Sequence, residues 1–177
     1  MNKKILIFGG TGAIGFSIAK NLKDQGYNPI IIARNKQDLI SKSKEINCSY
    51  EICDVLEIDQ IKEIALKHSE NVIGLAYCVG SINLRPLKIT KDQDFIESFK
   101  VNTLGAINAV KMNLQSLTDN NGSILFFSTI AVQQGFTNHS IVSSSKAAIE
   151  GLTLCLAAEF APKLKVNCIA PSLTDSK

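Results

Sequence analysis

Residues 5–15 read ILIFGGTGAIG, an apolar run that passes through glycines into a segment whose apolar residues have helical spacing. The pattern G-x-G-x-x-G is present as Gly10, Gly12 and Gly15, and Gly9 offers an alternative first glycine. A strand that turns through glycines into a helix presents backbone amides and the positive end of the helix dipole, which favour an anion. In this context the pattern predicts a loop that cradles a dinucleotide pyrophosphate. The alternative interpretation is a structural turn.

Apolar runs and stretches of helical periodicity alternate along the rest of the chain. Strands are expected at Lys4–Phe8, Pro29–Ala33, Tyr50–Cys53, Val72–Cys78, Gly122–Ser128 and Lys165–Ala170. Helices are expected at Ile14–Gln25, Lys36–Lys44, Leu56–Lys67, Asp92–Leu117 (capped by Thr90 with Gln93) and Asn138–Phe160. Nearly continuous apolar strands are typical of a parallel sheet that is buried on both faces. We therefore predict an α/β fold of the Rossmann type, with a doubly wound sheet, and one domain over residues 1–177.

Composition excludes several classes of protein. Apolar residues make up 45% of the chain and charged residues 20%, which is typical of a soluble globular protein. A net charge of +3, without a long basic run, argues against a nucleic-acid partner. Lys3 and Lys4 precede an apolar run too short for an export signal or a membrane span, so a cytoplasmic protein is expected. Its cysteines match no zinc spacing, so we expect no metal site, and we interpret them as reduced, small buried apolar residues: Cys48, Cys53, Cys78, Cys155 and Cys168.

The segment NHSIVSSSKAAIEG, residues 138–151, resembles the catalytic helix of the short-chain dehydrogenase/reductase family, and the resemblance extends from Lys4 to Asp175. That family places a tyrosine four residues before a lysine, so that both lie on one face of a helix. Lys146 matches the lysine, and Val142 stands at the tyrosine's position. Valine has no proton to donate, so the resemblance implies the family's binding site without its usual acid.

The resemblance also implies the other catalytic groups. Asn102 matches the asparagine that anchors a relay water, with a structural polar residue as the alternative. The serine that holds the substrate oxygen lies thirteen residues before the tyrosine, which assigns Thr129 to this role, with Ser128 as the neighbouring candidate. Lys146 is implied to bind the nicotinamide ribose. His139 and Tyr77 are candidate replacement acids, and a core or surface role is the alternative for each.

The coenzyme is implied to be a nicotinamide dinucleotide. Its proposed ligands are Gly9, Thr11, Gly12, Ile14, Gly15, Arg34, Asp54, Val55, Gly80, Lys146, Pro171, Leu173 and Thr174. Arg34 stands at the end of the second strand, where an acidic residue grips the ribose in NAD-binding proteins. Arginine pairs instead with a 2′-phosphate, so NADP(H) is the preferred coenzyme and NAD(H) remains possible. The alternative for Arg34 is a solvated surface residue. Asp54 is implied to contact the adenine, and it can equally cap the following helix, alone or together with that role.

Two functions remain open from the sequence. The first is an oxidoreductase that transfers a hydride between NADP(H) and a carbonyl or alcohol. The second is a catalytically impaired NADP(H)-binding sensor or scaffold, which Val142 favours. The resemblance further implies a homo-oligomer built on the helices 92–117 and 138–160. Family members continue beyond the equivalent of Lys177 into substrate-loop helices and a seventh strand, so the chain is expected to be incomplete there and the substrate is not readable.

Overall fold

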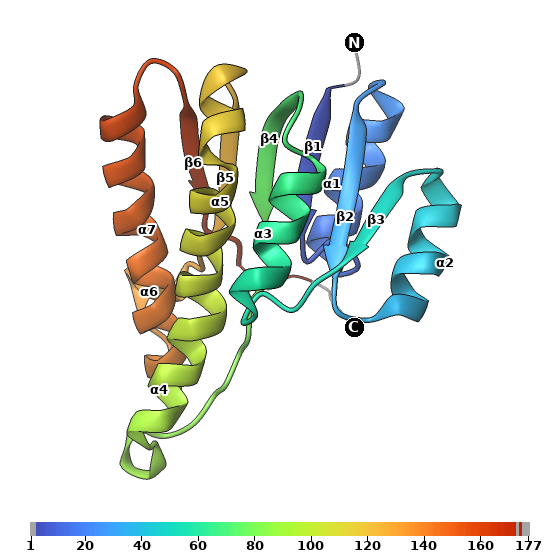
Figure 1. Ribbon diagram of the computed structural model, residues 1–177. Coiled ribbons are helices and arrows are strands. Elements are labelled where there is room, and N and C mark those ends of the chain that lie inside the picture. The colour runs from blue at the N-terminus through green and yellow to red at the C-terminus, as the bar shows by residue number, and fades with distance from the viewer. Residues whose placement is uncertain (1–2, 173, 175–177) are drawn as a thin grey trace.

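Parallel strands form the centre of the computed structural model, which describes residues 3–172 and residue 174. The described residues form one six-stranded sheet in the order β3-β2-β1-β4-β5-β6 (Figure 1). The strands are β1 (Lys4–Phe8), β2 (Asn28–Ala33), β3 (Ser49–Ile52), β4 (Val72–Tyr77), β5 (Ser123–Phe127) and β6 (Lys165–Ile169). The order reverses between β1 and β4, and a sheet of this kind binds ligands in the crevice at the carboxyl ends of the strands on either side of such a reversal.

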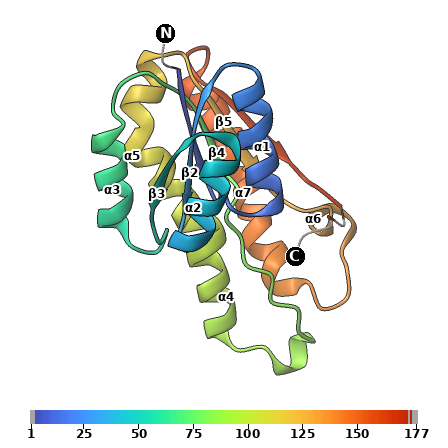
Figure 2. The same ribbon diagram turned by 90° about the vertical axis from the view of Figure 1, so that its right-hand side faces the viewer.

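Helices cover both faces of this sheet. Helices α1 and α2 lie on one face, and α3, α5 and α7 lie on the other (Figures 1 and 2). The helical elements are α1 (Ala13–Asp24), α2 (Lys36–Ile46), α3 (Ile58–Lys67), the 3₁₀ turn η1 (Leu87–Ile89), α4 (Asp92–Phe99), the π-helical η2 (Lys100–Leu104), α5 (Gly105–Asp119), α6 (Ala131–Gln134) and α7 (Ser140–Phe160).

Alternate residues of β1 supply the two cores. Ile5 and Ile7 pack under α1 and α2, whereas Leu6 and Phe8 pack under α3, α5 and α7. Strands buried on both faces require this nearly continuous apolar sequence. The predicted Rossmann-type sheet is therefore confirmed, and each predicted strand is present with ends that differ by one residue at most.

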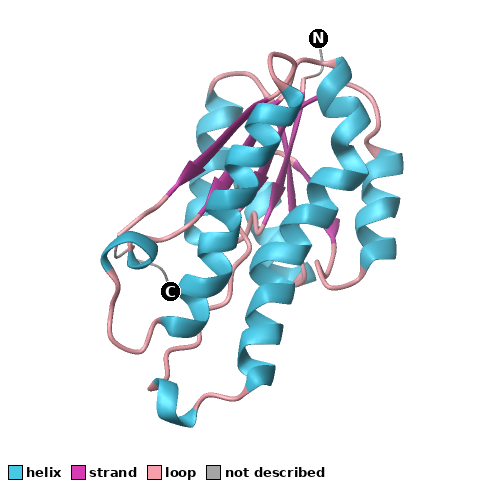
Figure 3. Ribbon diagram, turned by 90° about the vertical axis from the view of Figure 1, so that its left-hand side faces the viewer, coloured by secondary structure: helices cyan, strands magenta, loops and turns pink. Residues whose placement is uncertain are grey.

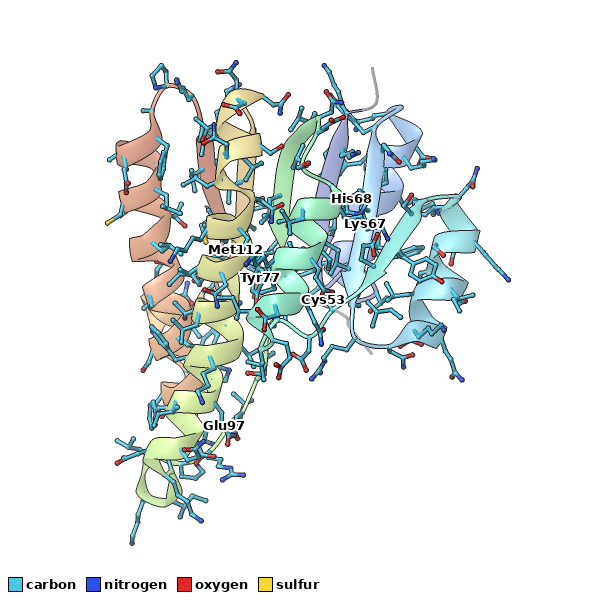
Figure 4. All side chains as sticks on the ribbon, viewed as in Figure 1. Cys53, Lys67, His68, Tyr77, Glu97 and Met112 are labelled. Atoms are coloured by element: carbon cyan, nitrogen blue, oxygen red, sulfur yellow. The ribbon has the colours of Figure 1, made fainter. Side chains whose placement is uncertain are left out.

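The long helix predicted over 92–117 is wrong as a single regular helix. The π-helical turn Lys100–Leu104 separates α4 from α5. Tyr77 explains the interruption, because its hydroxyl donates a 2.7 Å hydrogen bond to the carbonyl of Val101. A carbonyl that accepts a hydrogen bond from outside the helix does not need a partner within it, so the regular hydrogen-bond pattern of the helix can be interrupted there. Gly105 makes room for this hydroxyl, and Figure 4 shows Tyr77 beside α5.

The predicted cap of this helix is also corrected. Asp94 accepts the Lys91 amide at 2.9 Å, as in a capping box. The Thr90 hydroxyl instead donates to the Leu87 carbonyl at 2.9 Å, and Gln93 donates to Glu97 at 3.0 Å. The capping pattern predicted for Thr90 with Gln93 is therefore made by Lys91 with Asp94, one residue later in the sequence.

Among the described residues, α7 alone is long and apolar enough to cross a membrane by length and composition. It lies beside α4 (Figure 3) and buries Ile141 and Ile149 within the protein, so packing accounts for much of its apolar character.

Of the five cysteines only Cys53 is fully buried, and Cys155 is exposed, so the expected burial of all five is wrong.

Glu51 on β3 supports the edge of the sheet through a small charged cluster. Its Oε1 lies 2.8 Å from both the Lys67 Nζ and the His68 Nε2 (Figure 4 labels both partners). Burial acts to raise the pKa of Glu51, but the hydrogen bonds and charges of Lys67 and His68 outweigh it and lower the pKa from its ordinary 4.5. A carboxyl with a lowered pKa stabilises the fold above its ordinary pKa, and this contribution is lost as the pH falls through the lowered value.

We expect Glu51→Gln to reduce the free energy of unfolding by about 1 kcal/mol at neutral pH, because a hydrogen bond to a charged group is replaced by a weaker one. The difference from the parent protein should shrink as the pH falls below about 4, where the parent carboxylate also becomes protonated. Urea denaturation across this pH range measures it. Glu63→Gln, on the exposed surface of α3, is the matched control. A deficit that is constant with pH would contradict the ionic origin.

Candidate functional site

The turn between β1 and α1 is fixed by Gly9 and Gly15. Gly9 has a φ of +79°, and a side chain on it would lie 2.8 Å from the backbone of Cys78. A side chain on Gly15 would collide with the carbonyl of Gly9. Gly9 therefore requires glycine for its backbone conformation and its contact with the end of β4, and Gly15 requires it for the close packing of α1 on the turn.

The same geometry chooses between the two interpretations of the glycine pattern. A side chain on Gly10 would lie 2.6 Å from Ile31 on β2, so this glycine serves packing against the sheet. A side chain on Gly12 would meet only the Gly9 carbonyl, at 3.4 Å, and would otherwise enter open space. Gly12 is therefore the position that leaves room for a ligand. The loop is therefore described by Gly9, Gly12 and Gly15, the alternative interpretation of the pattern.

The amino end of α1 suits a pyrophosphate. Gly12 is the N-cap of α1, no side chain caps the helix, and its first turn contains no acidic residue. The amides there are not neutralised by a side-chain oxygen, and the helix dipole adds a partial positive charge. Gly12 is exposed, and Thr11 and Ile14 beside it are half-buried. These residues can hold a dinucleotide at its phosphates.

Arg34 and Asp54 follow neighbouring strands and meet at the carboxyl edge of the sheet. The Arg34 Nη1 lies 3.8 Å from the Asp54 Oδ2, and the side chains are 75% and 32% exposed. The Asp54 Oδ1 accepts the Leu56 amide at 3.0 Å, whereas α3 begins at Ile58 with Glu57 as its N-cap. Asp54 therefore caps a turn and not the helix, which corrects the capping alternative. Val55 beside it is buried.

Lys146 is buried on α7 and points to the end of β5. Its Nζ donates a 2.8 Å hydrogen bond to the carbonyl of Phe127. Burial lowers the pKa of Lys146 to about 8, against smaller raising effects of Cys168 and Cys78. A buried ammonium has lost hydration and is easier to deprotonate. At neutral pH the group still carries most of its positive charge.

Gly80 separates Lys146 from Asn102. A side chain on Gly80 would lie 3.4 Å from the Lys146 Nζ and 3.2 Å from the Asn102 Oδ1. The structure thus brings together these three predicted residues, which come from α7, η2 and the segment after β4. The sequence indicated this glycine only through its resemblance to a family motif, and the two side chains that flank it give the steric reason.

The Asn102 side chain is fully buried and its hydrogen bonds are satisfied. Its Oδ1 accepts the Ser81 amide at 2.9 Å. Its Nδ2 donates to the hydroxyls of Ser98 and Ser145, each at 3.0 Å, and lies 3.2 Å from the Ser81 carbonyl. The Asn102 side chain is therefore engaged in hydrogen bonds within the protein that hold η2, α4, α7 and the segment after β4 together. Ser98 and Ser145 were not singled out from the sequence, although Ser98 lies four residues before Asn102 and Ser145 lies three residues after Val142.

The two candidate hydroxyls after β5 differ in their engagement. Ser128 is buried and donates to the Glu150 Oε1 at 2.6 Å. Thr129 is half-buried, and its Oγ1 accepts the Ala131 amide at 3.3 Å. The Ser128 proton is thus committed, whereas the Thr129 hydroxyl has no hydrogen-bond acceptor among the described residues. Glu150 was not singled out from the sequence, because a carboxylate on a helix gives no signal of a partner in a distant strand.

Tyr77 and His139, the candidate replacement acids, occupy different surroundings. Tyr77 is 2% exposed, and burial raises the pKa of its hydroxyl, with the charges of Cys53 and Asp54 adding to the effect. Its proton is held by the Val101 carbonyl, so Tyr77 is a core residue and not an acid. The His139 Nδ1 lies 2.8 Å from the Thr137 carbonyl in the loop that precedes α7.

A backbone hydrogen bond joins this loop to the one that precedes α4. The Arg85 amide donates to the Asn138 carbonyl at 3.1 Å. The side chain of Arg85 is held in turn by Asp94, at 3.3 Å. The loops 81–91 and 135–139 are thus connected on the side of the molecule where Gly80 and α7 approach each other.

An apolar groove of about 430 Å³ lies between α1 and the ends of β5 and β6. Its lining includes Ile14 and Thr174, both predicted coenzyme ligands, together with Ala13, Ser17, Ile18, Leu125, Phe127 and Ile169. The Pro171 carbonyl accepts the Ile130 amide at 3.2 Å and fixes the segment after β6. Leu173 lies outside the described residues. The groove offers an apolar surface to a flat ring that extends from the glycine loop.

The glycine loop, the uncapped helix and the reversal of strand order define a dinucleotide-binding α/β domain of the Rossmann type. The family model described as short chain dehydrogenase matches residues 3–177, and the chain belongs to this family of oxidoreductases. The reductase names among its relatives agree with this assignment.

Two curated relatives and one solved structure illustrate the similarity. The chain is 25% identical to carbonyl reductase family member 4 of Danio rerio over 98% of its own length and 76% of the relative. It is 29% identical to the human 3-oxoacyl-[acyl-carrier-protein] reductase over 97% of its length and 75% of the relative. A short chain dehydrogenase from Shigella flexneri 2a, complexed with NADP, superposes with a TM-score of 0.92 at 25% identity, over 99% of this chain and 80% of that one.

Proposed function

We propose that the protein is an NADP(H)-dependent oxidoreductase that reduces a small carbonyl compound reversibly. The observation that carries the proposal is the convergence of Lys146, Gly80 and Asn102 beside a glycine loop whose helix is not capped by a side chain. A protein that only binds a dinucleotide has little need of a buried lysine at this place. The reductase relatives and the NADP-bound structural neighbour support the same reaction class.

Each residue has a task in this proposal. The loop Gly9–Gly15 and the amino end of α1 hold the pyrophosphate, and Arg34 meets the 2′-phosphate. Lys146 binds the nicotinamide ribose, and the free Thr129 hydroxyl donates a hydrogen bond that orients the substrate oxygen. The coenzyme supplies the hydride when it is bound. Because Val142 has no proton, the proton at the substrate oxygen comes from water held near Lys146.

Val142 supports the second candidate function, a sensor or scaffold that binds NADP(H) without turnover. Its side chain is apolar and only 4% exposed, so it neither donates a proton nor holds a water. Turnover under saturating coenzyme separates the two candidates, because a scaffold binds the coenzyme and leaves carbonyl compounds unchanged.

We also propose that the protein forms a homo-oligomer. An apolar groove of about 440 Å³ lies along α4 and α7, and its lining residues are Phe95, Ile96, Phe99, Lys100, Leu104, Ile141, Ser144 and Ser145. Of these, Ile96, Phe99 and Leu104 are exposed, and clustered exposed apolar residues are typical of a surface that another protein covers. The same helices were indicated for the contact between copies by the family resemblance.

Calorimetric titration with NADPH and NADH tests the proposal, with Arg34→Asp as the decisive variant. The parent protein should bind both coenzymes saturably and NADPH more tightly. The variant should lose about tenfold or more in NADPH affinity, because a charge-assisted bond to the 2′-phosphate is replaced by repulsion. NADH affinity should change much less, since NADH has no phosphate at that position.

Lys44→Gln, at the far end of α2, is the control for a general loss of positive charge. Absence of saturable binding of either coenzyme would refute the proposed function. An unchanged ratio of the two affinities in Arg34→Asp would leave the function standing but remove Arg34 from coenzyme selection.

A further inference from the structure

Glu150 stands one helical turn after Lys146 on α7 and is half-buried. Its Oε1 accepts the Ser128 hydroxyl proton at 2.6 Å, a short distance that is typical of a hydroxyl bound to a carboxylate. Removing a carboxylate from water is costly unless a donor compensates it. The contact therefore fixes both side chains, although they are 22 residues apart in the sequence.

Ser128 is the central residue of a three-residue segment whose outer members serve the site. The carbonyl of Phe127 accepts the Lys146 Nζ at 2.8 Å. Thr129 carries the hydroxyl that is proposed to hold the substrate oxygen. The Ser128 amide donates to the Ile169 carbonyl at 2.8 Å, so the segment is tied to β6 through its backbone and to α7 through its side chain.

From these contacts we propose that Glu150 is a positioning residue: by holding Ser128, its carboxylate sets the segment 127–129 so that the Phe127 carbonyl restrains the Lys146 amine and the Thr129 hydroxyl is free for the substrate. The meaning of this placement for catalysis rests on the proposed function. The placement itself is a property of the coenzyme-free protein and can be measured there.

The pH titration of Lys146 reports on this arrangement. With lysine labelled by ¹³C at the ε-carbon, the Lys146 signal is identified by its loss in Lys146→Arg and followed as the pH is raised. The parent protein should titrate near pH 8, since burial lowers the pKa, and the titratable neighbours Cys78 and Cys168 affect it less. In Glu150→Ala the released amine should reach water and its pKa should rise toward 10.5.

The direction of the shift separates positioning from plain electrostatics. Loss of a nearby negative charge alone would lower the lysine pKa, because the ammonium would lose a favourable neighbour. Glu150→Gln loses the charge but keeps an oxygen acceptor for Ser128, so its Lys146 should titrate at the parent value or slightly below it. Glu159→Ala, exposed on the same helix, should not change the titration.

Ser128→Ala removes the other partner of the contact and should raise the Lys146 pKa as Glu150→Ala does. It provides the test even if Glu150→Ala does not fold. An unchanged or lowered pKa in a folded Glu150→Ala or Ser128→Ala protein would overturn the proposal, as would equal rises in Glu150→Gln and Glu150→Ala. Failure of coenzyme binding would refute the proposed function but leave this titration interpretable.

Discussion

Replacing Val142 by tyrosine is expected to raise NADPH-dependent turnover of simple aldehydes and ketones at least tenfold. Position 142 lies one helical turn before Lys146, so a tyrosine there shares its helix face. A phenol would provide the proton donor that valine lacks, and a positioned acid contributes on the order of 10² to 10⁴ in rate. The charge of Lys146 would also lower the pKa of the phenol. Loss of NADPH absorbance with a panel of carbonyl compounds measures the effect.

Val142→Phe is the matched control, because it adds the same ring without the hydroxyl. Val142 is 4% exposed, so both variants enlarge a packed position, and their thermal unfolding has to be compared first. A tyrosine variant that binds NADPH normally but turns over no faster than the phenylalanine variant would show that the rest of the site is not arranged for reduction. The scaffold function would then be favoured.

Gly105→Ala is expected to lower the free energy of unfolding by about 1–3 kcal/mol, the usual cost of overpacking a core. The added methyl group would collide with the Tyr77 hydroxyl and lie 3.2 Å from a methyl group of Val55. The hydroxyl cannot move away without losing its 2.7 Å bond to the Val101 carbonyl. Urea denaturation followed by circular dichroism measures the change.

The double variant Tyr77→Phe/Gly105→Ala tests the stated cause. Tyr77→Phe alone leaves the Val101 carbonyl without its partner and should cost about 1–3 kcal/mol. In the double variant the collision partner is gone, so its loss of stability should be smaller than the sum of the two single losses. Gly151→Ala is the control, because beyond its own helix backbone and chain neighbours nothing lies within 4 Å of the added carbon, and alanine favours a helix. If Gly105→Ala were as stable as this control, the steric explanation would be wrong.

Local pattern was sufficient to predict the strands and the glycine loop. The strands are apolar on both faces, and the glycines that form the turn directly follow the first strand in the sequence. The break in the helix 92–117 could not be predicted, because its cause is Tyr77, a residue from a different strand. Tyr77 was considered as an acid since the resemblance placed it near the nicotinamide, whereas packing under α5 buries it.

The candidate site likewise combines residues that could be predicted from the sequence with contacts that could not. The resemblance placed Lys146 and Asn102 in one centre, and the structure brings both beside Gly80. It gave no sign of Glu150, because the contact with Ser128 depends on how α7 lies across the end of β5. Arg34 was predicted as a coenzyme ligand, and its ion pair with Asp54 was not, since the two residues meet only when β2 and β3 are paired.

The hydrogen bond between Arg85 and Asn138 couples the two loops that precede α4 and α7. Either loop can swing outward only by carrying the other along or by giving up this bond. A bond of this kind contributes about 1 kcal/mol net, less than twice the thermal energy RT. By itself this bond therefore restrains the separation of the two loops only weakly, in contrast to the paired strands of the sheet.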